Sequence, residues 1–456
     1  MIQTSKLGSQ KHFTFIFTQF SQFAKDTLKP RNLMKKTLTI ICLFAVLYSH
    51  AQLPDHIYYP SIHSVKLYKA GDIYSYPVIA LNSGELLELH FDDLESGAKN
   101  CYYSYQLCNA DWTPSNLQAF DYIRGFQSNR ITTYRYSSLS FTKYTHYQAT
   151  IPDRNCVPTK SGNYLLKVFL NNDTSQLLFT KRFLVVENRV AIGAQLLKPF
   201  SAALGISDQR VQVGISTANA QINVLSPQDL KVVILQNNIW PTSIFLNKPN
   251  IYRGNYFEYN DDGLSFPAGK EWRWIDLRSM RLMSDRMAKI VDTLKKIDIF
   301  VKPDGERKGQ VYVYYRDLDG IFTIENEDGN NPDWQSDYGT IHFTYVPPGG
   351  QAYPGRDLYI FGELTNYSLD ETSKMVFNPE RGVYEGSLFL KQGYYNYTYI
   401  TVDGTKPRDR YSFGNTEGNY DITENNYTVL VYYRAFGARY DELIGYTVVN
   451  TLTATR

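Results

Sequence analysis

Two runs of alternating residues decide the fold class of this chain. They read Ser161-Gly-Asn-Tyr-Leu-Leu-Lys-Val-Phe-Leu170 and Leu177-Leu-Phe-Thr-Lys-Arg-Phe-Leu-Val-Val186, with the turn residues Asn171-Asn-Asp173 between them. Runs rich in β-branched and aromatic residues and bounded by turn residues predict neighbouring β-strands. The Gly-x-Tyr that opens the first run matches the tyrosine corner of immunoglobulin-like sandwiches, and we expect the Tyr164 hydroxyl to bond back to the chain.

Similar short runs fill the chain from residue 57 onward, and its 38 tyrosines among 456 residues suit strands with one buried face. We therefore predict an all-β protein of tandem immunoglobulin-like or early-set β-sandwich domains. The predicted divisions are a first sandwich, a second sandwich, a third sandwich after the linker Pro347-Pro-Gly-Gly350, and a C-terminal tail, at 55–188, 190–346, 350–436 and 437–456. The only helical pattern spans 285–296, and the run 310–315 predicts one of the strands.

A secretory signal precedes the sandwiches. Met34-Lys-Lys-Thr37 is basic, Leu38–Leu47 is apolar, and Ser49 and Ala51 are the small residues of a cleavage site. The apolar run is too short to span a bilayer, which takes about 20 residues. We expect cleavage after Ala51, export to the periplasm, and no transmembrane segment in the mature chain.

Residues 34–51 are thus the predicted signal peptide, and 1–33 are an upstream extension from a misassigned start or a long basic region. Cys42 lies inside the apolar run instead of at the cleavage point, which disfavours a lipoprotein. Cleavage removes seven of the 47 basic and one of the 45 acidic residues, so the mature chain has a net charge of −4. That charge gives no electrostatic reason to bind nucleic acid.

No catalytic constellation is present. The sequence has no His-Glu-x-x-His, phosphate loop or dinucleotide fingerprint, and Gly214-Ile-Ser-Thr-Ala218 only approaches a nucleophile elbow. The histidines of the mature chain stand singly, mostly on predicted strands, and are expected to be packed or surface residues: His56, His63, His90, His146 and His342. We predict no enzyme activity and no catalytic, cofactor-binding or metal site. A hydrolase with an unrecognised site remains a weaker alternative.

Acidic pairs and cysteines leave two alternatives open. Asp92-Asp93, Asp261-Asp262 and Asp317-Leu-Asp319 are expected in turns, where carboxylates usually accept hydrogen bonds from their own backbone. Calcium binding is the functional alternative. A disulfide is plausible in the first domain, with either Cys101 or Cys108 bonded to Cys156.

The third segment resembles an early-set immunoglobulin-like module, similar to the glycogen-binding modules of starch enzymes. The resemblance is carried by Gly382–Leu390, Tyr394–Ile400 and Val402-Asp-Gly404. Such modules stack sugars on exposed tryptophans, but all five tryptophans precede residue 350. A carbohydrate-binding periplasmic or cell-surface protein, using tyrosines such as Tyr394, Tyr395 and Tyr397, is therefore the alternative function.

Eight segments together resemble the plug protein family of the type IX secretion system. They are Ser75–Gly84, Leu89–Leu94, Asn109–Ser115, Tyr122–Phe126, Tyr144–Tyr147, Ser161–Tyr164, Trp272–Arg278 and Arg439–Tyr446. The resemblance implies a non-enzymatic periplasmic protein, associated with the outer membrane, that occludes the periplasmic end of the translocon β-barrel. It implies a monomer within a hetero-complex.

Aromatic and arginine residues commonly anchor such interfaces. The candidate contact residues lie in loops of the first sandwich: Asp111, Trp112, Tyr122, Arg124 and Phe126. Packing of these loops is an equally good interpretation. Trp272, Trp274, Asp276 and Arg278 alternate along one strand, which favours a buried tryptophan face with an internal ion pair over a binding patch.

Overall fold

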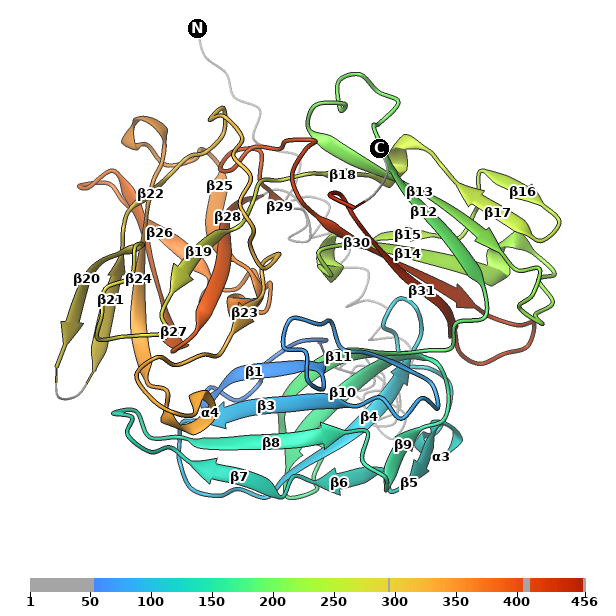
Figure 1. Ribbon diagram of the computed structural model, residues 1–456, viewed down its shortest axis with the longest axis horizontal. Coiled ribbons are helices and arrows are strands. Elements are labelled where there is room, and N and C mark those ends of the chain that lie inside the picture. The colour runs from blue at the N-terminus through green and yellow to red at the C-terminus, as the bar shows by residue number, and fades with distance from the viewer. Residues whose placement is uncertain (1–52, 294–295, 405–410, 454–456) are drawn as a thin grey trace, which may run out of the picture. The chain divides into compact units, whose positions relative to one another are not determined.

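The structure is a computed structural model, which describes residues 53–293, 296–404 and 411–453 (Figure 1). Its described residues are almost all in strands, turns and loops, so the predicted all-β sandwich architecture is confirmed. The predicted signal peptide at 34–51 and the extension at 1–33 lie outside the described residues.

The first sandwich packs a four-stranded sheet on a five-stranded sheet. The first sheet has the order β1 (Ile62–Lys69), β3 (Leu87–Asp93), β8 (Thr145–Ile151) and β7 (Thr133–Tyr136). The second has the order β2 (Val78–Ala80), β11 (Leu177–Val186), β10 (Gly162–Leu170), β4 (Cys101–Cys108) and β6 (Ser128–Arg130). The Tyr164 hydroxyl donates to the Lys160 carbonyl at 2.8 Å, which confirms the predicted tyrosine corner.

The second sandwich joins strands that are far apart in the sequence. One sheet has the order β12 (Ala191–Leu197), β13 (Asp208–Ser216), β17 (Tyr256–Tyr259) and β16 (Ile251–Arg253), with β18 (Ser265–Pro267) also on β13. The other has the order β15 (Ile244–Leu246), β14 (Leu230–Gln236), β30 (Asn426–Tyr433) and β31 (Glu442–Asn450). Val213, Val232 and Val429 from the two sheets share one buried core.

The third sandwich is one continuous sheet that bends. Its strands run in the order β19 (Arg273–Asp276), β28 (Tyr394–Asp403), β25 (Arg356–Phe361), β26 (Lys374–Asn378), β27 (Val383–Lys391), β24 (Tyr338–Val346), β21 (Ile297–Val301) and β20 (Met287–Asp292). Short strands β22 (Asp304–Gly305), β23 (Phe322–Thr323) and β29 (Tyr411–Ser412) add to it. β26 pairs with β25 through its first residues and with β27 through its last, so the two halves enclose a common core.

This pairing corrects the predicted ranges of the second and third sandwiches. β19 to β24 lie within the predicted second range, 190–346, but belong to the third sheet. β30 lies in the predicted third range, 350–436, and β31 in the predicted tail, 437–456, yet both complete the second sandwich. The reason is physical: adjacent runs along the chain reveal local strands, whereas pairing is decided by which apolar faces meet.

Two local predictions are also wrong. The stretch predicted as a helix at 285–296 contains β20, which pairs with β21. The run 310–315 alternates like a strand but pairs with no other strand in the described residues. Its alternation has another cause, because the hydroxyls of Tyr312 and Tyr315 bond to the Glu271 carboxylate and the Trp272 carbonyl. Val311 and Val313 point into solvent with 86% and 63% of their surface exposed.

Helical segments are short. The two described α-helices are α3 (Ala119–Tyr122) and α4 (Pro332–Gln335). Single 3₁₀ turns lie at Pro227–Asp229, Trp240–Thr242, Asp262–Leu264, Pro348–Gly350 and Glu363–Thr365.

Buried polar contacts join the three sandwiches. Lys66 of β1 forms an ion pair with Glu363, and Asp92 of β3 forms one with Lys391 of β27, each at 2.5 Å. The Tyr432 hydroxyl donates to Asn163 at 2.7 Å, which joins the second sandwich to the first. Because a buried charge needs its partner, these contacts hold the sandwiches in one arrangement.

Candidate functional site

The structure separates the five predicted contact residues into two groups. Trp112 packs edge-on against Trp240 of the second sandwich, and its ring lies 4.9 Å from the Arg182 guanidinium. Tyr122 is buried, and its hydroxyl donates to the Tyr105 carbonyl at 3.3 Å. These two side chains serve packing. Asp111, Arg124 and Phe126 are exposed.

Arg124 and Phe126 belong to a segment that we name the lip. The lip comprises residues 119–126 together with the strand that pairs with them. α3 leads directly into β5 (Ile123–Gly125), which pairs with β9 (Cys156–Pro158) in a two-stranded sheet. α3 starts where the Asp121 carboxylate accepts a hydrogen bond from the Gln118 amide at 3.0 Å. The lip leaves Phe120 and Phe126 with 71% and 66% of their surface exposed.

Gly125 is required for this geometry. Its φ is +99°, and a Cβ there would lie 2.2 Å from the Asn155 carbonyl oxygen. The same oxygen accepts a hydrogen bond from the Phe126 amide at 2.6 Å. A side chain at position 125 would therefore displace the strand that presents Phe126. Phe120 was not among the predicted contact residues, although it lies only two residues before the predicted Tyr122 in the sequence.

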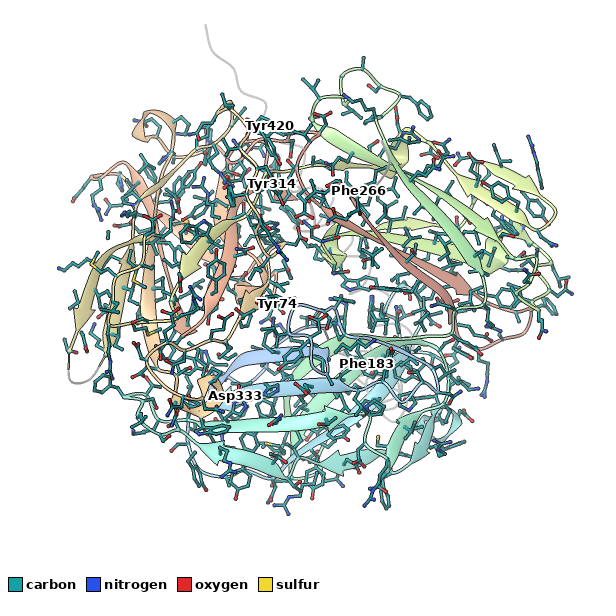
Figure 2. The ribbon with its side chains drawn as sticks, in the orientation of Figure 1. Tyr74, Phe183, Phe266, Tyr314, Asp333 and Tyr420 are labelled. Carbon is teal, nitrogen blue, oxygen red and sulfur yellow. The ribbon has the colours of Figure 1, made fainter. Side chains whose placement is uncertain are left out.

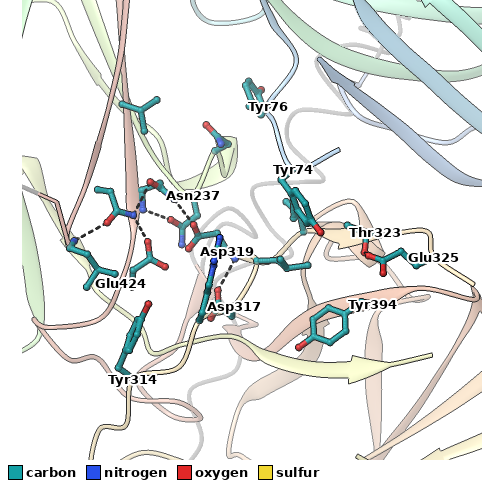
Figure 3. A pocket seen from close by; sticks show the side chains of 18 of the residues that line it. Tyr74, Tyr76, Asn237, Tyr314, Asp317, Asp319, Thr323, Glu325, Tyr394 and Glu424 are labelled. Atoms are coloured by element: carbon teal, nitrogen blue, oxygen red, sulfur yellow. Dashed lines mark hydrogen bonds between the residues drawn. The ribbon is translucent and has the colours of Figure 1, made fainter. Parts of the chain in front are cut away.

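A pocket of about 880 Å³ opens between segments of all three sandwiches (Figure 3). It is lined by Tyr74 and Tyr76 of the first, Asn237 and Glu424 of the second, and Asp317, Asp319 and Tyr394 of the third, among others. The aromatic side chains labelled in Figure 3 are Tyr74, Tyr76, Tyr314 and Tyr394. The lining mixes aromatic, amide and carboxylate side chains.

Three carboxylates gather at this pocket. One oxygen each of Asp317, Asp319 and Glu424 lies within 4.8 Å of the others. Burial, together with the charges of Glu271 and Glu424, raises the pKa of Asp317 to about 7. Burial and the charges of Glu424 and Asp317 raise the pKa of Asp319 well above its usual range. The Asp317 carboxylate accepts a hydrogen bond from the Asp319 amide at 2.7 Å, as expected for acids in turns.

The other acidic pairs differ from one another. Asp261 accepts from the Gly263 amide at 2.8 Å, which is the predicted turn contact. Asp92 and Asp93 are buried within β3, so their predicted placement in a turn is wrong. The alternation of β3 puts Leu89 and Phe91 into the sandwich core and sends Asp92 to the opposite face, where the third sandwich covers it.

On that covered face a chain of polar side chains runs between two sandwiches. Lys391 and the Tyr338 hydroxyl donate to one Asp92 oxygen, and the other oxygen contacts His146 Nδ1 at 2.7 Å. His146 Nε2 then lies 3.1 Å from His90 Nδ1. Burial lowers the pKa of His90 to about 4, so this imidazole is neutral at neutral pH. The sequence predicted histidines that stand singly as packed or surface residues, and the structure brings these two together.

The three cysteines within the described residues form no disulfide. Cys101, Cys108 and Cys156 are buried free thiols, so the suggested bridge to Cys156 is wrong. Burial raises the pKa of each thiol to about 12, which keeps all three protonated.

The run Trp272–Arg278, which carries two tryptophans, bears on the carbohydrate alternative. Trp272 is buried, as the favoured interpretation expects. Arg278 pairs with Asp276 at 2.7 Å, but both side chains are partly exposed, so this ion pair is not internal. Trp274 lies against Tyr394, because β19 pairs with β28 in one sheet. Tyr395 and Tyr397 are buried, so a sugar cannot stack on them.

Comparisons with known proteins address the family. Residues 62–187 match the family model described as type 9 secretion system plug protein, first domain. A crystal structure of a hypothetical protein from Parabacteroides merdae ATCC 43184 is 34% identical, covers 88% of this chain and all of its own length, and superposes with a TM-score of 0.83. The chain belongs to the type IX secretion system plug family. A search of curated proteins finds no match.

Membership of the plug family ties the chain to type IX secretion and to the cell envelope. The matched range begins and ends with the strands of the first sandwich, β1 to β11, which carries the lip. Within the described residues, none of the helices has the length and apolar character that a membrane crossing requires.

Proposed function

We propose that this plug-family chain occludes the periplasmic end of the type IX translocon barrel in the outer membrane, without catalysis. The observation that carries the proposal is the match of the first sandwich to the first domain of the plug family. The chain is proposed to act in the periplasm as a single copy within a hetero-complex.

A plug needs a stiff surface, and the contacts between the sandwiches support that property. The Asp92 to Lys391 ion pair and the Lys66 to Glu363 ion pair are both largely buried. Removing one partner of either pair would leave an unpaired charge away from water, which costs about 3 to 5 kcal/mol. The described body is therefore suited to block an opening instead of yielding to it.

The lip is the proposed contact with the barrel. Phe120 and Phe126 are apolar and mostly exposed, and Arg124 between them is exposed as well. Exposed aromatic and arginine side chains in one short segment match the composition of interface centres. Trp112 and Tyr122 are left out of this contact because they are internal.

A pull-down from detergent-solubilised envelopes tests the proposal. Tagged mature protein is expected to recover a very large outer-membrane protein in stoichiometric amount, identified by mass spectrometry. A Phe120→Ala/Phe126→Ala variant is expected to weaken recovery about tenfold or more, as interface anchors do. Phe436→Ala, which removes a phenylalanine with 91% of its surface exposed, is the matched control and is expected to bind normally.

Two results would count against the proposal. Recovery of the tagged protein alone, from an extract in which the translocon is intact, contradicts the partner. Retention on a polysaccharide column together with that result favours the carbohydrate alternative. Equal recovery by the lip variant and the wild type contradicts the lip as the contact while leaving the partner in place.

A further inference from the structure

We propose that His90, His146 and Asp333 form a zinc site that joins the first sandwich to the third. The three residues come from β3, β8 and α4, and none belongs to a metal-binding sequence motif. Asp333 is labelled in Figure 2, where α4 reaches the sheet that holds β3 and β8. The inference goes beyond plugging and revises the expectation of no metal site.

The distances between the three ligand atoms suit zinc. His90 Nδ1 lies 3.1 Å from His146 Nε2, and Asp333 Oδ1 lies 3.9 Å from the first and 4.0 Å from the second. A point equidistant from atoms so separated is about 2.1 Å from each, and zinc binds imidazole nitrogen and carboxylate oxygen at about 2.0 to 2.2 Å. That point lies in the plane of the three atoms. Tetrahedral zinc places its ligand atoms about 3.4 Å apart, so binding needs changes of about 0.6 Å or less in these separations and leaves a fourth position for water.

The surroundings orient His146 as a ligand. Its Nδ1 contacts Asp92 Oδ1 at 2.7 Å, and Asp92 has no exposed surface. The carboxylate accepts the Nδ1 proton, so Nε2 carries the lone pair and faces His90. Metal-bound histidines usually donate their other ring N–H to a carboxylate in this way.

His90 supplies an independent observation. Without a metal, its Nδ1–H donates to the His146 Nε2 lone pair, which leaves His90 Nε2 as a buried nitrogen with no hydrogen-bond partner. Metal binding to Nδ1 moves the proton to Nε2, where the Glu88 carboxylate lies 3.8 Å away. The metal-bound tautomer thus gives the unpaired nitrogen a nearby acceptor, and an unpaired buried polar atom calls for such an explanation.

The local charge favours a cation. Lys391 neutralises Asp92, and its ammonium donates to the Asp333 backbone carbonyl, so it does not occupy the Asp333 carboxylate. Asp333 and Glu88 then contribute two negative charges beside two imidazoles. Imidazole with carboxylate is a donor set that zinc accepts.

Native mass spectrometry and thermal unfolding test the site. Tag-free mature protein is treated with EDTA, dialysed and titrated with zinc chloride. Wild type is expected to bind one zinc ion per chain and to unfold at a higher temperature when zinc is present. Asp333→Asn and His90→Gln are each expected to weaken zinc binding at least tenfold and to lose the zinc-dependent rise in unfolding temperature.

Matched controls separate the site from general metal binding. Asp285→Asn removes an exposed carboxylate of the same sandwich, and His342→Gln removes a histidine that faces Asp298 at 3.0 Å. Both are expected to bind zinc as wild type does. Failure of wild type to bind zinc, or wild-type affinity in a folded Asp333→Asn or His90→Gln variant, overturns the proposal in favour of a histidine pair that shares only a proton.

Discussion

Asp319 has one carboxylate oxygen, Oδ1, that is buried and accepts no hydrogen bond. Its other oxygen accepts from Asn426 at 2.5 Å. Because its pKa is raised in the folded chain, the folded state holds a proton more tightly than the unfolded state. The free energy of unfolding therefore falls as the pH rises from about 4, the ordinary aspartate value, through the higher folded pKa.

Asp319→Asn is expected to stabilise the protein at high pH. Asparagine keeps an acceptor for Asn426, tolerates the positive φ of 52° at this position, and removes a charge from beside Asp317 and Glu424. We expect a gain of about 1 to 2 kcal/mol in the free energy of unfolding at pH 8, shrinking toward zero at pH 4. Urea unfolding at both pH values in EDTA measures it. A loss of stability at pH 8 would contradict the buried-charge explanation.

The three cysteines are expected to be unreactive in the folded protein. Their thiols are buried and protonated at neutral pH, and the thiolate is the reactive form. A thiol reagent such as Ellman's reagent should label none of them at pH 8 in buffer and all three in guanidinium chloride. Labelling of only one thiol in guanidinium without reductant would show a disulfide and contradict the structure.

The contacts of a single residue can be predicted from the sequence only where its close neighbours along the chain form a recognisable local pattern. The tyrosine corner at Tyr164 was predictable because Gly162 and Tyr164 are neighbours. The pairing of His90 with His146 was not, because 56 residues separate them and only the register of β3 with β8 places them together. The sequence placed Asp92 and Asp93 in a turn, because it could not reveal that the third sandwich buries the polar face of β3.

Strands were largely predictable because period-two alternation is a local property. The order of strands in the sheets was not, because β14 pairs with β30 across nearly 200 residues. Residues 310–315 show the limit of the pattern, since tyrosines held by Glu271 and Trp272 alternate without a sheet.

Strand β31 is expected to be essential for the second sandwich. It pairs with β30 along its whole length and contributes Ile444 to the buried core. Truncation after Tyr440 removes it and exposes the β30 edge, so we expect aggregated protein or loss of cooperative unfolding. Truncation after Asn450, which retains β31, is the control and should remain soluble. A soluble, cooperatively unfolding protein ending at Tyr440 would contradict this assignment.

The molecule as a whole depends on ion pairs between its sandwiches. Lys391→Met leaves Asp92 buried beside His146 without its cation, although Tyr338 still donates to it. We expect a loss of about 3 to 5 kcal/mol in the free energy of unfolding, as for other broken buried pairs. Lys302→Met, at an exposed lysine, should change stability by less than about 0.5 kcal/mol. Equal effects of the two substitutions would contradict a structural role for the Asp92 contact.

Occlusion itself is measured by the conductance of the translocon. Purified barrel is reconstituted in a planar bilayer, and mature plug-family protein is added to the periplasmic side. We predict that the conductance falls to near the background of the bilayer, that the Phe120→Ala/Phe126→Ala variant requires a higher concentration, and that Phe436→Ala behaves as wild type. Unchanged conductance at concentrations where the protein is bound to the barrel would contradict the plug function.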